Sequence, residues 1–333
     1  MCHLIYTDTF YMKRKWIRWV SWILLTPIIL FVILMVLLYV PPVQNLLRRE
    51  VTAYASKATG MQIQVERIDL RFPLNLLVRG VEVIQQPDTL LSLESLNVRV
   101  QAWPLIKGKV EVDEVTLSRV AVNSADLMEG MNIKGVLGRF FLQSHGVDLS
   151  NELAVINQVE LSDTHVQLLM NDTTTTPKDT TASAPINWKV ALHQLKLKNV
   201  SFSMQLPADS MRMAAHIGEA AIDDAQADLK NQYYDLKKFL LSGTSVSYDT
   251  GTAQPAEGFD ASHIAVRDIR IALDSLLYKG RDMNAVIREF TMNERSGLSV
   301  TSLTGRAYSN DSVICVPVSY THLRAHETSQ DLV

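Results

Sequence analysis

The chain has 333 residues, of which 47% are hydrophobic and 20% charged, and its formal net charge is −3. A chain of this length can bury a sizeable core, but the near-neutral charge provides no basic face for nucleic acid, so we expect no nucleic-acid partner. The cysteines, Cys2 and Cys315, stand near opposite ends of the chain, which excludes an internal disulfide framework.

The N-terminal region predicts a membrane anchor. From Trp19 to Tyr39 no residue is charged, and at a rise of about 1.5 Å per residue such a helix crosses a hydrocarbon core of about 30 Å. We therefore expect a transmembrane helix over residues 19–40. A basic cluster precedes it, which indicates that residues 1–18 are cytoplasmic. The cluster consists of Lys13, Arg14, Lys15 and Arg18.

No small-residue cleavage site follows this segment, so the sequence favours an uncleaved, single-pass anchor over a signal peptide. The predicted location is the bacterial inner membrane, with the body of the protein in the periplasm. Directly after the anchor, residues 41–60 predict a short amphipathic helix that ends at Gly60. Its apolar positions are Val43, Leu46, Leu47, Val51, Tyr54, Ala55 and Ala58.

Residues 61–316 predict a mainly β body made of irregular repeats. Apolar residues recur at positions −3, +2, +7 and +9 from a series of anchor positions, with polar pairs such as Lys198 and Asn199 between them. We interpret each copy as a strand, a tight polar connection and an antiparallel strand. Apolar side chains should point inward, and polar ones such as Glu160 and Lys196 outward. The predicted inward-facing residues are Leu96, Val98, Val115, Leu117, Val159, Leu161, Val166, Leu195, Leu197, Phe202, Phe239, Leu241, Val246, Ile269, Ile271 and Leu276.

Several segments depart from the repeat. Residues 171–185 are polar and of low complexity, which predicts a disordered loop. Residues 124–142 and 223–238 are the remaining candidates for helices. Residues 317–333 resemble a translated sequencing adapter, so we expect this tail to lie outside the natural fold.

A sheet with one apolar face must cover that face with helices, with a second sheet, by curling, or with a ligand. Because long helices are scarce, the strands should form either an elongated β groove or a closed β-sandwich. A groove open to a bilayer would hold the acyl chains of phospholipids, and the inward-facing residues would line it. The alternative is a single-pass envelope scaffold whose β-sandwich body binds protein or glycan.

The sequence contains no catalytic or phosphate-binding motif of a known type. Its histidines are scattered, and His165 and His193 are best explained as surface residues. Adjacent acidic residues such as Asp223 and Asp224 point to opposite faces of a strand and cannot pair for acid–base chemistry. We expect no catalytic residue, no cofactor and no metal ligand, so the chain is not predicted to be an enzyme.

Four segments after the predicted anchor and short helix are distinctive: residues 60–70 (GMQIQVERIDL), 78–83 (VRGVEV), 89–100 (TLLSLESLNVRV) and 103–117 (WPLIKGKVEVDEVTL). Together with the anchor and the helix they resemble, over residues 13–120, the TamB-type translocation and assembly module proteins of the AsmA-like family. The resemblance implies a periplasmic β groove tethered to the inner membrane, with roles in phospholipid transport towards the outer membrane and in outer-membrane protein assembly. It also implies an Omp85-type barrel partner, bound through a C-terminal region that this sequence does not include.

Overall fold

The structure is a computed structural model of the whole chain. It describes residues 26, 29, 36, 40–72, 74–85, 87–106, 111–124, 127, 130–148, 151–171, 187–310, 314–315 and 318–324. The predicted anchor at 19–40 therefore falls almost entirely outside the described residues, and so does most of the predicted loop at 171–185. Among the residues that are described, no helix is long and apolar enough to cross a membrane.

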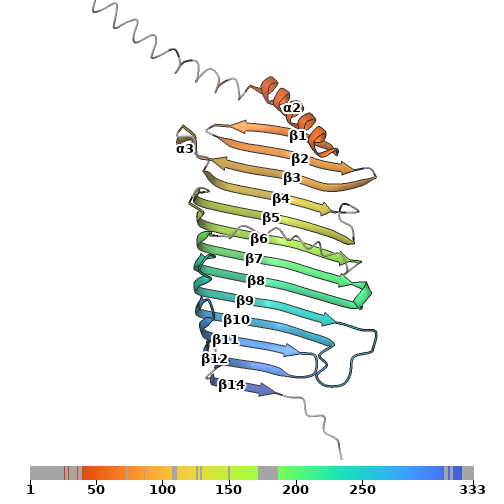
Figure 1. Ribbon diagram of the computed structural model, residues 1–333, viewed down its shortest axis with the longest axis vertical. Helices are drawn as coiled ribbons and strands as arrows, with labels where there is room; N and C mark the ends of the chain where they lie inside the picture. Colours follow the sequence, from red (N-terminus) through yellow and green to blue (C-terminus); the bar gives the residue numbers. More distant parts are fainter. Residues whose placement is uncertain are drawn as a thin grey trace, which may run out of the picture.

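The body is one open 14-stranded sheet in which nearly every strand pairs with the next one in the chain (Figure 1). The prediction of a mainly β body is confirmed. The strands are β1 (Gln62–Arg71), β2 (Asn75–Gln85), β3 (Asp88–Val100), β4 (Val112–Asn123), β5 (Met131–Asp148), β6 (Leu153–Met170), β7 (Lys189–Leu206), β8 (Met211–Asp228), β9 (Tyr233–Asp249), β10 (His263–Lys279), β11 (Asp282–Glu294), β12 (Ser299–Ser309), β13 (Ile314–Cys315) and β14 (Val318–Arg324). A short helix, α3 (Ala102–Ile106), joins β3 to β4, and a 3-10 turn, η1 (Pro207–Asp209), joins β7 to β8.

One strand pair corrects the expectation of purely antiparallel repeats. β6 and β7 are parallel, with Leu161 opposite Leu197. Parallel neighbours need a crossover connection, and the segment between Met170 and Lys189 is long enough to provide one.

The prediction that the polar pairs between the apolar positions form turns is wrong. These pairs form β-bulges inside long continuous strands. Lys198 and Asn199 are both exposed, while Leu197 before them and Val200 after them are half-buried. Asn199 has φ 53° and lies outside the regular pairing of β7 with both of its neighbours. A bulge of this kind places two successive side chains on one face and bends the strand.

Equivalent bulges lie side by side across the sheet and form what we call the first kink line. Its left-handed residues are Gly80, Arg119, Asp163, Asn199, Gly243 and Asp268, with φ values between 46° and 59°. The backbones of neighbouring strands approach each other closely at this line: a Cβ added to Gly218 of β8 would lie 2.9 Å from the carbonyl oxygen of Gly243 in β9. Glycine is therefore required where two backbones approach at the kink.

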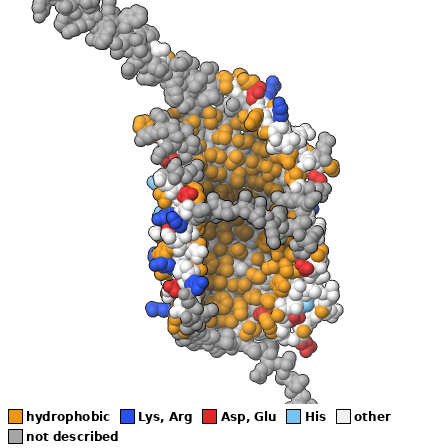
Figure 2. Space-filling view, viewed as in Figure 1, with side chains coloured by type: hydrophobic (Ala, Val, Ile, Leu, Met, Phe, Trp, Pro, Cys, Tyr) orange, Lys and Arg blue, Asp and Glu red, His pale blue; other side chains and the backbone are white. Residues whose placement is uncertain are grey.

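Strands β6 to β9 bend again at a second kink line, formed by Asn157, His193, Asp224 and Lys237. Asp224 has φ 54°. Because both kink lines place their paired side chains on the same face, both bend the sheet away from that face. The opposite face is therefore concave, and hydrophobic side chains line it (Figure 2).

Neither of the two candidate helices within the body is present in the part of the chain that the structure describes. Most of residues 124–142 belong to β5, and residues 223–238 hold the end of β8, a turn and the start of β9. The apolar residues Leu137 and Phe140 flank the bulge at Gly138 and Arg139. Their spacing imitates one turn of a helix because the bulge shifts the alternation by one residue.

The predicted helix after the anchor is confirmed as α2 (Pro41–Thr59). Pro41 opens it, where a missing N–H costs nothing, and Gly60 closes it in the left-handed conformation with its N–H bonded to the Ser56 carbonyl at 3.0 Å. Residues 318–324, within the tail predicted to be a translated adapter, form β14 and pair with β12.

α2 lies along β1, the first edge of the sheet (Figure 1). Gln44 Nε2 donates to the Leu70 carbonyl at 3.0 Å, and Arg48 Nη1 donates to the Glu66 carbonyl at 2.7 Å. The Ile63 N–H donates to Ser56 Oγ at 3.0 Å. The helix thus satisfies backbone groups that an edge strand would otherwise leave open to pairing with another chain.

Candidate functional site: a concave apolar face

The hollow face of the sheet carries side chains aligned in continuous rows, which together we call the apolar face. The first row lies close to the first kink line and crosses the sheet from β1 to β12 through directly paired residues. Its members are Ile68, Val78, Leu96, Leu117, Phe140, Leu161, Leu197, Ala220, Leu241, Ile271, Phe290 and Leu303.

Further rows run parallel to the first. The second contains Leu70, Leu76, Val98, Val115, Leu142, Val159, Leu195, Ile222, Phe239, Leu273 and Ile287. The third contains Ile63, Val83, Leu91, Val122, Gly135, Val166, Phe202, Ala215, Val246 and Val266. The fourth, beyond the second kink line, contains Ile156, Leu192, Ala225, Leu236, Leu276, Ala285 and Ala307.

Every inward-facing residue predicted from the sequence lies on the apolar face. All but one fall in the four rows; Ile269 lies between the first and third rows and pairs with Thr244. The sequence interpretation missed Phe140 of β5, because residues 124–142 were a candidate helix, and Ile222 of β8, which precedes the other candidate helix and belongs to none of the predicted repeats. Trp103, at position +7 from Leu96 in the predicted repeat, lies in α3 and is exposed.

The other face of the same strands is polar. Glu160 of β6 lies opposite Lys196 of β7, and both alternate with residues of the first and second rows. At the kink lines the outward side chains bond to one another across strands. Asn199 Nδ2 donates to Asp163 Oδ1 at 2.7 Å, His193 Nδ1 lies 3.0 Å from Asp224 Oδ1, and Arg119 pairs with Glu94.

As far as β10, no member of the four rows has a charged side chain. The few hydroxyl groups of the apolar face bond locally: Thr164 Oγ1 donates to the Ser162 carbonyl at 3.3 Å and Thr244 Oγ1 to the Ser242 carbonyl at 3.4 Å. Both threonines follow a bulge directly, so each uses the carbonyl that the bulge displaces from the ladder. The hydroxyl groups are therefore satisfied without a partner from outside the sheet.

The apolar face is only partly covered by protein. Phe202 and Val246 keep 41% and 39% of their surface exposed. All described strands belong to a single sheet, so no second sheet packs against this face and the β-sandwich alternative is not what the described residues form. Large side chains in a protein core are normally buried far more completely than this.

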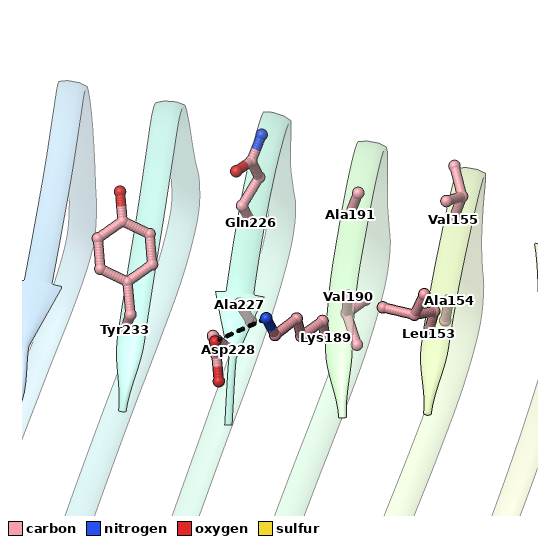
Figure 3. Close-up of a pocket in the computed structure, with 10 residues that line it drawn as sticks. All are labelled: Leu153, Ala154, Val155, Lys189, Val190, Ala191, Gln226, Ala227, Asp228 and Tyr233. Atoms are coloured by element: carbon pink, nitrogen blue, oxygen red, sulfur yellow. Dashed lines mark ion pairs between the residues drawn. The ribbon is translucent and has the colours of Figure 1, made fainter. Parts of the chain in front are cut away.

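A pocket of about 350 Å³ lies at the ends of β6–β9, beyond the second kink line (Figure 3). Small and branched apolar side chains such as Ala191 and Val155 line it. Lys189 Nζ lies 3.6 Å from Asp228 Oδ2 at its edge. Hydrogen bonds from Asn231, and more weakly the charge of Lys189, hold the pKa of Asp228 below its ordinary value. This carboxylate is therefore ionised and neutralised by its neighbours, which does not suit a proton-transfer role.

His193 is paired with Asp224 on the polar face, and His165 is exposed on the same face. Over the ranges that the structure describes, no group of three or more His, Cys, Asp or Glu side chains is arranged to hold a metal ion. Comparison of the chain with protein-family models and with curated protein sequences gives no match.

Proposed function

We propose that the apolar face binds the acyl chains of phospholipids and that the chain is an inner-membrane-anchored, periplasmic lipid-transport protein of the TamB-type, AsmA-like class. The observation that carries this proposal is the unbroken first row, which leads from β1 beside α2 to β12 without a charged side chain. A lipid could move from strand to strand along such a surface without passing through water.

The energetic argument is strong for acyl chains. Each buried methylene contributes about 0.8 kcal/mol, so the two chains of one phospholipid would lose on the order of 20 kcal/mol on exposure to water. A carrier must therefore offer continuous apolar contact. The half-buried side chains of the apolar face provide it, and their incomplete burial by protein leaves area that an acyl chain can cover.

The head group would remain at the rim or in solvent, because the four rows offer no charged partner for a phosphate. Transport towards the outer membrane and assistance to outer-membrane protein assembly with an Omp85-type barrel belong to the same proposal. They rest on the resemblance of residues 13–120 and on the predicted anchor at 19–40.

The test is whether the purified full-length chain carries phospholipid, detected by mass spectrometry after exchange into a lipid-free detergent. Leu197→Asp places a charge in the first row and should abolish most of the bound lipid. Lys196→Asp is the matched control, because it makes the same substitution on the polar face of the same strand and should retain lipid.

Circular dichroism separates the possible results. Loss of lipid in Leu197→Asp with an intact β spectrum supports the proposal. Lipid-free wild-type protein, or Leu197→Asp retaining as much lipid as Lys196→Asp, would overturn it in favour of a scaffold without a lipid site.

A further inference from the structure

α2 presents a different face to the sheet from the one its sequence pattern leads one to expect. The residues of α2 that bond to the edge of the sheet are polar: Gln44, Arg48 and Ser56. Thr52 has the same four-residue spacing, but its hydroxyl bonds within the helix, to the Arg48 carbonyl at 2.9 Å. Val43 and Ala55 are half-buried, whereas other apolar residues of the helix are left outside the sheet. Tyr54 keeps 78% of its surface exposed, Leu46 59% and Val51 48%.

Other large exposed side chains gather at the same end of the molecule. Phe72, in the turn after β1, is 86% exposed, and Trp103, in α3, is 69% exposed. The Val100 N–H donates to the Leu74 carbonyl at 3.0 Å, so the segments that carry these aromatic residues are neighbours. Hydrophobic side chains and basic ones stand side by side around α2 in Figure 2.

The position of α2 in the chain identifies what would cover its apolar side. It begins at Pro41, directly after the uncharged segment 19–40, so a membrane anchor would release the chain at the bilayer surface at this point. Interfacial helices bury an apolar side at the boundary between head groups and acyl chains, flanked by Lys and Arg for the phosphates. Exposed Arg49 and Lys57 are placed for that role, and tyrosine and tryptophan favour this depth.

We propose that α2 is an interfacial helix, with Leu46, Val51 and Tyr54 inserted into the periplasmic leaflet of the membrane that holds residues 19–40. This inference rests on the anchor in the proposed function. It goes beyond that function by assigning α2 a partner, the bilayer surface, and an orientation. With one side bonded to β1 and another side in the leaflet, α2 holds the first strand, and so the start of the first three rows of the apolar face, against the membrane.

The test measures membrane depth at opposite sides of α2 in the full chain. Cys2→Ser and Cys315→Ser remove the native thiols, and Tyr54→Cys or Asn45→Cys introduces a single site for a nitrobenzoxadiazole label. These positions are nine residues apart, which places them on opposite sides of a helix with about 3.6 residues per turn. The protein is reconstituted into vesicles of phosphatidylethanolamine and phosphatidylglycerol that contain nitroxide-labelled lipid.

We expect the label at position 54 to be quenched several-fold more strongly than the label at position 45 and to emit at shorter wavelength. Equal quenching at the two positions, in protein that resists carbonate extraction, would overturn the interfacial role of α2 while leaving the anchor intact. Release of the protein by carbonate would instead overturn the anchor, and this inference with it. Co-purification of lipid is a separate measurement, so it tests the lipid site independently of the anchor and of the interfacial role of α2.

Discussion

Gly138 of β5 stands directly against Asp163 of β6 at the first kink line. A Cβ added to Gly138 would lie 2.7 Å from the Asp163 Cβ and 3.0 Å from the Asp163 carbonyl oxygen, closer than real contacts of this kind. We expect Gly138→Ala to destabilise the sheet by about 1–3 kcal/mol, the usual cost of forcing extra volume into a packed site. The midpoint of urea unfolding, followed by circular dichroism, measures the effect.

Gly135→Ala is the matched control, because the same change in the same strand meets only ordinary contacts, the nearest at 3.5 Å from the His165 carbonyl oxygen. A Gly138→Ala protein as stable as Gly135→Ala would show that the two strands separate freely at the kink.

The bulge at Asn199 predicts a second difference in stability. Asn199 adopts φ 53°, which asparagine and glycine tolerate and a β-branched residue does not. Asn199→Val should therefore cost about 1–2 kcal/mol from backbone strain. Asn199→Gly also loses the exposed bond to Asp163 but keeps the backbone conformation, so it should remain close to wild type in the same unfolding experiment. Equal losses in the two variants would assign the effect to the hydrogen bond instead of to the backbone.

The edge between α2 and β1 can be tested at a single amide. The Ile63 N–H bonds to Ser56 Oγ. Ser56→Ala removes the acceptor, so we expect exchange of the Ile63 amide hydrogen with deuterium to accelerate while amides at the centre of the sheet keep their rates. Asn45→Ala, an exposed change in the same helix, should leave Ile63 unaffected. Unchanged exchange in Ser56→Ala would mean that packing alone protects the edge.

The loop before β10 should loosen in acid. Asp260 accepts the backbone N–H groups of Ala256 and Ser262 at 3.0 and 2.9 Å, and His263 Nδ1 lies 2.9 Å from it. These interactions, the Ala256 bond foremost, lower the pKa of Asp260 from 3.8 to about 2. Because the folded pKa is depressed, the stabilisation is present above about pH 4 and is lost as the pH falls towards about 2.

The measurement is the hydrogen-exchange protection factor of the Ser262 amide between these two pH values. Protection should fall in the wild type and should be low and insensitive to pH in Asp260→Asn. The Gly280 amide, which bonds to the Gln232 carbonyl at 3.0 Å, contacts no carboxylate and serves as the reference. A parallel loss of protection at Gly280 would indicate general unfolding of the sheet.

The periodicity of the sequence was sufficient to assign side chains to faces, but not to trace the strands. Leu195 and Leu197 alternate as a half-buried strand requires, and Lys196 between them is exposed as predicted. At Lys198 and Asn199 the same chemistry that favours a turn also favours a bulge, since both use residues that tolerate left-handed backbone. Local sequence does not distinguish a turn from a bulge, because the chain reverses direction after a turn and continues in the same direction after a bulge.

The parallel β6–β7 pair could not be predicted for a related reason. A row of alternating apolar residues fits a neighbour in either direction, and direction depends on where the intervening connection ends. The contact between the polar side of α2 and β1 was also not predicted. The hydrogen bonds of Gln44 and Arg48 to a strand edge produce no periodic signal in the sequence beyond the polar residues themselves.

The parallel pair also has a kinetic consequence. Antiparallel strands can begin pairing beside the connection that joins them, as Asp249 of β9 and His263 of β10 do at 14 residues apart. In β6 and β7 every directly opposed pair is 36 residues apart in the chain, and so are Asp163 and Asn199, which bond across these strands. Closing so large a loop costs entropy before any pairing compensates for it, and contacts of high sequence separation form slowly. The sheet should therefore assemble as an N-terminal block ending at β6 and a C-terminal block starting at β7, and the junction between these blocks should form last.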